Sequence, residues 1–85
     1  MKITAPASGR IQEIYTLTGE AVVPGTLLLS IEAAKEEIEI RSSVRGVVQA
    51  IQTSAYRTVT AGDFLLDIRE LAESSMEMLW SDEGK

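Results

Sequence analysis

Two stretches of the chain carry the same pattern: GRIQEIYTLTGEAVVPGTLLLSI at residues 9–31 and GVVQAIQTSAYRTVTAGDFLLDI at residues 46–68. The second follows the first at a constant offset of 37 positions, without a gap. Counting from Ile3, which falls on Ile40, ten positions are identical in the two copies. Two copies are too few for a solenoid, which needs about three repeats to bury a continuous core. The repeat therefore predicts one closed domain made of two halves related by a pseudo-twofold axis.

Within each copy, short apolar strands alternate with turn signals. Pro24-Gly25 and Ala61-Gly62 fit the middle of matching tight turns. The apolar runs that follow, at residues 27–31 and 64–68, fit buried strands. Short strands separated by such turns are typical of an all-β sandwich or flattened barrel, which is the fold that we predict.

Two irregularities recur at matching positions of the copies. Ile14 and Ile51 break the alternation of apolar residues in their strands, which indicates a twist or bulge. Gly9 and Gly46 precede these strands, where a positive φ or a close backbone approach favours a residue without Cβ.

The junction of the halves, EAAKEEIE at residues 32–39, is locally ambiguous. Its Ala, Glu and Lys residues favour a helix. The repeat, however, leaves only about four residues, 33–36, for the chain to reverse direction, and the alternation from Glu37 onward favours a strand. We therefore predict a central β-hairpin with Lys35 at its tip, on the pseudo-twofold axis.

The composition excludes several kinds of chemistry. The 85 residues include no histidine and no cysteine, which rules out imidazole catalysis, thiol nucleophiles, disulfides and imidazole or thiolate metal sites. The net charge of −5 argues against a nucleic-acid binder. No apolar run approaches the ~20 residues of a membrane span, and no signal-peptide pattern is present. We expect a cytoplasmic protein without metal, membrane or nucleic-acid contacts, and not an enzyme acting alone.

The charge is unevenly distributed along the chain. Residues 70–85 hold five acids and one base, whereas residues 1–69 hold eight acids and seven bases. This difference predicts a domain at 1–69 and an acidic tail at 70–85. Residues 70–80 fit a short amphipathic helix, and residues 81–85 are expected to be disordered.

A set of residues around the predicted hairpin resembles a known family. The set consists of Ala5-Pro6-x-x-Gly9, Gly19-Glu20-x-Val22, Gly25, Glu32-Ala33-x-Lys35, Ile38 and Gly46. It looks like the biotinyl/lipoyl carrier domain family over residues 3–68, and is most similar to biotin carboxyl carrier domains. The resemblance implies a barrel-sandwich hybrid, a flattened barrel of two four-stranded sheets. It also implies that the lysine lies on the exposed turn furthest from the termini.

The resemblance further implies a covalent attachment site at Lys35. Biotin is the expected cofactor and lipoate the alternative. Glu32 and Ala33 agree with the Glu-Ala-Met-Lys-Met tip of biotin domains, whereas Ala34 and Glu36 replace the methionines beside the lysine. Lipoyl domains usually have aspartate before the lysine and a small apolar residue after it, and this chain has neither. The comparison favours biotin.

The function implied is that of a carrier that moves a carboxyl group between active sites of a biotin-dependent carboxylase, decarboxylase or transcarboxylase. The implied partners are a biotin protein ligase and carboxylase and carboxyltransferase subunits or domains. An unmodified structural or docking module of the same fold is a further alternative. The second half also departs from the family pattern, because Tyr56-Arg57 stands where a Gly-Asp/Glu turn is expected.

Overall fold

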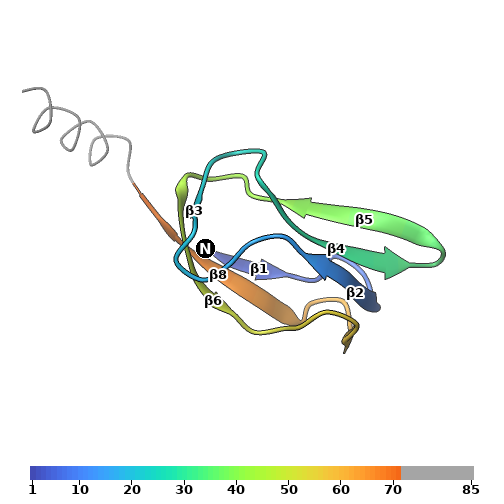
Figure 1. Ribbon diagram of the computed structural model, residues 1–85. Helices are drawn as coiled ribbons and strands as arrows, with labels where there is room; N and C mark the ends of the chain where they lie inside the picture. Colours follow the sequence, from blue (N-terminus) through green and yellow to red (C-terminus); the bar gives the residue numbers. More distant parts are fainter. Residues whose placement is uncertain (72–85) are drawn as a thin grey trace, which may run out of the picture.

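The computed structural model describes residues 1–71, which form eight β-strands (Figure 1). The strands are β1 (Lys2–Thr4), β2 (Gly9–Ile14), β3 (Ala21–Val22), β4 (Leu27–Ala33), β5 (Glu36–Arg41), β6 (Gly46–Ile51), β7 (Thr58–Val59) and β8 (Phe64–Glu70). The all-β prediction is confirmed, and the helical alternative for residues 32–39 is wrong. Within the described residues there is no helix that could cross a membrane.

The predicted acidic tail is described only at its start. Glu70 is the last residue of β8, one position beyond the boundary expected at Arg69, and Leu71 follows it outside the strand. The rest of the predicted helix and the expected disorder at 81–85 lie outside the described residues.

The eight strands form two antiparallel four-stranded sheets, as expected. Their orders are β1-β8-β6-β3 and β5-β4-β2-β7. When 37 is added to the residue numbers of β2, β3 and β4, the results are the first and last residues of β6, β7 and β8. The same shift places β1 on the last three residues of β5. The same operation converts one sheet order into the other, so the predicted pseudo-twofold relation is confirmed.

The position expected for Lys35 relative to this axis is wrong. The offset carries Ala33, at the end of β4, onto Glu70, at the end of β8. The β4–β5 turn therefore corresponds to the place where β1 starts beside β8, with Lys2 opposite Asp67. The pseudo-twofold operation thus exchanges the β4–β5 turn with the end of the domain where β1 starts, so Lys35 lies at one end of the domain and not on the axis (Figure 1).

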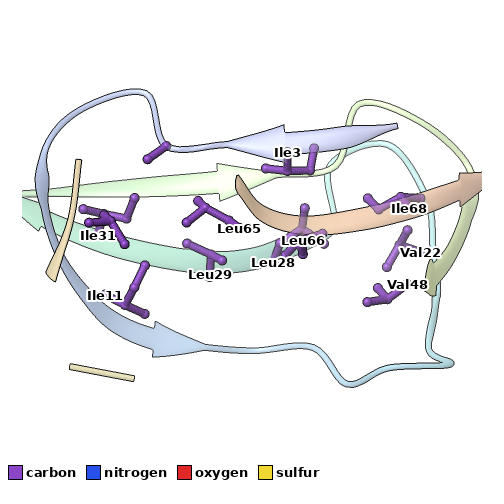
Figure 2. Packing of buried hydrophobic residues seen from close by; sticks show 12 residues of the cluster. Ile3, Ile11, Val22, Leu28, Leu29, Ile31, Val48, Leu65, Leu66 and Ile68 are labelled. Atoms are coloured by element: carbon purple, nitrogen blue, oxygen red, sulfur yellow. The ribbon is translucent and has the colours of Figure 1, made fainter. Parts of the chain in front are cut away.

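Buried side chains from both sheets fill the space between them (Figure 2). Ile11 and Ile31 gather toward one end of the core, and their repeat partners Val48 and Ile68 gather toward the other. Four leucines occupy the middle: Leu28, Leu29, Leu65 and Leu66. All of these side chains are at most 1% exposed. Burial of such side chains contributes about 1.5–3 kcal/mol each, and the repeat places one equivalent set in each half.

The predicted bulge is present in both halves. The register of β2 against β4 shifts between Ile11 and Glu13, and that of β6 against β8 shifts between Val48 and Ala50. A bulge adds one residue to a strand and increases its twist. This extra residue explains why Ile14 and Ile51 fall out of alternation.

Of the two reasons offered for Gly9 and Gly46, close backbone approach is the correct one. Neither glycine has a positive φ. A Cβ at Gly9 would overlap the carbonyl oxygen of Glu32, and a Cβ at Gly46 would overlap that of Arg69. Each glycine thus lets the start of one strand lie directly against its neighbour.

Candidate functional site at the β4–β5 turn

The turn between β4 and β5 consists of two residues, Ala34 and Lys35. The pairing of β4 with β5 begins at Leu27 opposite Arg41 and continues to Ala33 opposite Glu36. The φ angles of Ala34 and Lys35 are 50° and 66°. Two central residues in the left-handed region are the mark of a type I′ turn, whose twist matches that of the flanking strands. The predicted hairpin is confirmed, with Lys35 at its tip.

The backbone conformation of this turn is unfavourable for its two residues, and the pairing of the flanking strands maintains it. Type I′ turns favour Asn and Gly, because a Cβ costs roughly 1–2 kcal/mol in the left-handed region. Ala34 and Lys35 both carry a Cβ. The long pairing of β4 with β5 fixes the register and outweighs this cost. Lys35 is therefore presented from one defined backbone conformation.

Replacing Ala34 with glycine is expected to stabilise the domain by about 1 kcal/mol, because it removes a Cβ from a left-handed residue. Ala33→Gly is the matched control, since Ala33 is in β4 and does not have a positive φ. That change should destabilise the domain by about 0.5–1 kcal/mol. Urea denaturation of the two variants measures both effects. Equal signs for the two changes would contradict the assigned turn.

The Lys35 side chain is exposed and has no polar partner. Within residues 1–71 it takes part in neither a hydrogen bond nor an ion pair. Glu39, further along β5, is bound by Arg41 at 2.9 Å. Glu32, Glu36 and Glu37 are exposed near the turn, and no described cation pairs with them. The tip thus presents one amine among three carboxylates.

The structure brings the predicted tip residues together, and each has a different place. Glu32 is on the outer face of β4, opposite Glu37. Ala33 is half-buried and contacts the core. Ala34 is the first residue of the turn, and Glu36 begins β5.

Residues outside the predicted tip also contribute to this end of the domain. Arg10 is directly opposite Glu32 in the pairing of β2 with β4. The guanidinium of Arg10 lies 5.8 Å from the centre of the Tyr56 ring. Two features of the sequence mark these residues: Tyr56 stands where the family pattern has glycine, and Arg10 directly follows Gly9. Neither feature predicts that the two side chains lie next to each other.

The chemistry available at this site is that of an accessible primary amine. In the described part of the chain there is no cavity, and no three acidic side chains gather in a way that could hold a metal ion. A lysine amine in its neutral form is a nucleophile toward activated acyl groups. An exposed turn of fixed conformation can present such an amine to the active site of another protein.

The comparisons with known proteins point to one family. Residues 17–68 match the family model described as "Biotin-requiring enzyme". The chain is 39% identical over 64 residues to the biotin carboxyl carrier protein of Streptococcus mutans, covering 75% of this chain and 49% of that protein. It is 27% identical over 67 residues to the biotin-dependent acyl-coenzyme A carboxylase alpha3 subunit of Mycobacterium leprae, covering 79% and 11% respectively.

A solved structure has the same fold as this chain. The lipoyl domain of the 2-oxoglutarate dehydrogenase complex from Azotobacter vinelandii superposes with a TM-score of 0.76 at 28% identity. The match covers 85% of this chain and 99% of that domain. By contrast, the chain spans about half the length of the Streptococcus mutans relative and about a tenth of the Mycobacterium leprae one.

Proposed function

Because the chain belongs to the biotinyl/lipoyl attachment domain family, we propose that it is a carrier of covalently bound biotin, attached through the Nζ atom of Lys35. The observation that carries the proposal is the position of this amine. It is exposed, it has no polar partner among residues 1–71, and it stands at the end of a two-residue turn of fixed conformation.

The residues of the tip fit covalent attachment. Lys35 in its neutral form adds to the acyl carbon of a carboxyl group that a ligase has activated. An amide bond to Nζ forms, the activating group leaves, and the nitrogen loses a proton. Lys35 is exposed, and the β4–β5 pairing fixes the backbone of the turn that carries it. No acid, base or further nucleophile of this chain is required.

The domain then serves to bring the attached group to the active sites that use it. Biotin, when bound, supplies a site that accepts and releases a carboxyl group. The chain contributes the tether, which raises the local concentration of the attached group at each active site within reach. The proposed partners are therefore a biotin protein ligase and the carboxylase and carboxyltransferase subunits or domains of a biotin-dependent enzyme. The names of the two curated relatives support this class of assembly.

Lipoate is the second candidate cofactor. Its support is the likeness to the lipoyl domain, which is 28% identical over most of this chain. Against it, Glu32 and Ala33 follow the biotin pattern, and Glu36 does not fit the small apolar residue usual after a lipoylated lysine.

Intact-mass measurement tests the assignment. The full chain is co-produced in separate cultures with a biotin protein ligase and with a lipoate ligase. We expect the mass of one biotinyl group to be added in the first culture, with peptide mapping that places it on Lys35. Gain of a lipoyl group alone would replace biotin with lipoate. No gain in either culture would contradict the carrier function.

A further inference from the structure

Three residues other than glycine have a positive φ within residues 1–71: Ala34, Lys35 and Tyr56. The first two form the turn. Tyr56, with φ of 69°, lies in the connection between β6 and β7, and its amide donates to the carbonyl of Ile11 at 2.7 Å. This bond places it beside β2, at the end of the molecule that carries the β4–β5 turn (Figure 1).

The pseudo-twofold relation shows what the fold itself requires at this position. The repeat partner of Tyr56 is Gly19, which has φ of 92° and donates to the carbonyl of Val48 at 2.7 Å. Both halves therefore need a left-handed residue here, and the first half uses glycine. Tyr56 bears the cost of a Cβ in this region, yet its side chain is 71% exposed and gains little from burial. A strained residue with an exposed aromatic ring points to a role outside the fold.

Arg10 completes the feature. Its guanidinium lies against the Tyr56 ring, and its repeat partner is the apolar Val47. Arg10 forms no ion pair or side-chain hydrogen bond with any of residues 1–71. An aromatic face and unused N–H donors are thus side by side. We name this pair the Arg10–Tyr56 platform.

The platform is within reach of a group attached at Lys35. Arg10 is opposite Glu32, which precedes Lys35 by three residues. At ~3.3 Å per strand residue and ~4.8 Å between strands, the Cα atoms of Arg10 and Lys35 are roughly 11 Å apart. About eleven bonds separate the lysine Cα from the ring system of a biotinyl group, so the extended arm is roughly 14 Å long. Arg10 and Glu32 are directly opposite each other, so their side chains project from the same face of the sheet.

We propose that the Arg10–Tyr56 platform binds the ring system of the biotinyl group attached to Lys35 and holds the arm against the carrier domain between reactions. The inference rests on the proposed function. The Arg10 guanidinium donates hydrogen bonds to a urea carbonyl oxygen, and the Tyr56 ring packs against the apolar part of the bicycle. The dithiolane ring of a lipoyl group offers no carbonyl acceptor for Arg10.

The experiment uses a Lys35→Cys variant of the full chain. Because the chain has no natural cysteine, the new thiol alone can be coupled to a biotin–maleimide reagent with a short linker. Backbone amide NMR shifts are compared with those of the same variant coupled to N-ethylmaleimide. We expect shift differences at residues 10, 56 and 57, and none at their repeat partners 47, 19 and 20, which provide the internal control.

A second variant shows whether the platform causes these differences. Tyr56→Gly introduces the residue that the first half has at the equivalent position, so the fold should be retained. We expect it to abolish the shift differences at residues 10 and 57. Differences confined to residues 33–37, or unchanged by Tyr56→Gly, would overturn the proposal. The coupling does not need a ligase, so this outcome is independent of whether Lys35 is biotinylated enzymatically.

Discussion

A Lys35→Arg variant is expected to lose all covalent attachment of biotin while keeping its fold. The arginine guanidinium remains protonated under all ordinary conditions and is not a nucleophile. Arginine has a Cβ like lysine, so it places the same demand on the left-handed turn position and keeps the positive charge. The measurement is intact mass after production with a biotin protein ligase, together with urea denaturation to establish that stability is unchanged.

Lys2→Arg is the matched control for this change. Lys2 is the other lysine among the described residues and lies in β1, beside the Phe64 ring at 5.7 Å. This variant should gain one biotinyl group as the unaltered chain does. Attachment that persists in Lys35→Arg would assign the modification to a different residue and would contradict the proposed site.

The second large effect is expected at the glycine that supports the hairpin. Gly9→Ala adds a Cβ that overlaps the carbonyl oxygen of Glu32 and also lies 3.1 Å from the Cβ of Ala33. Relief of this overlap requires movement of β4 near the turn. Forced overpacking of this kind costs about 1–3 kcal/mol, a large share of the stability of a small domain. We expect a fall in stability and roughly a tenfold slower biotinylation of Lys35, because the amine is displaced.

Gly46→Ala separates the two consequences. Gly46 is the repeat partner of Gly9, and a Cβ there creates the same overlap with the carbonyl oxygen of Arg69, in the other half of the domain. Its loss of stability should equal that of Gly9→Ala within about 1 kcal/mol, while the initial rate of biotinylation should remain that of the unaltered chain. Urea denaturation and initial rates measured well below the unfolding midpoint give the two quantities. Equal rates for both variants would show that Gly9 does not position the turn.

Much of this fold follows from the sequence because the repeat constrains it twice. An offset that matches Gly9 with Gly46 and Ile31 with Ile68 indicates the same local structure in both halves. Each strand predicted in one half is therefore supported by the matching pattern in the other half. The hairpin at residues 33–36 followed from this constraint against the helical propensity of its own residues. The tertiary pairing of β4 with β5 overrides that propensity.

The parts that could not be predicted depend on contacts between distant segments. The role of Gly9 is set by the path of β4 at Glu32, which lies more than twenty residues further along the chain. The expected place of Lys35 on the axis was wrong because the middle of the sequence need not lie on the symmetry axis: β4 corresponds to β8 and the end of β5 to β1, which places the β4–β5 turn opposite the β1/β8 end. Tyr56 showed only as a departure from a glycine pattern. Its proximity to Arg10 follows from the hydrogen bond to Ile11.

The interleaved sheets have a consequence for how the domain folds. β1 and β3 of the first half pair with β8 and β6 of the second, and β2 and β4 pair with β7 and β5. The pairings of β2 with β4 and of β6 with β8 are the two that lie within one half. Neither half can satisfy its backbone hydrogen bonds alone, so unfolding should be all-or-none and folding should take milliseconds to seconds, as in other domains rich in non-local pairing. A ligase that needs the intact β4–β5 turn would then accept completed chains only. The attached group would therefore mark a folded domain.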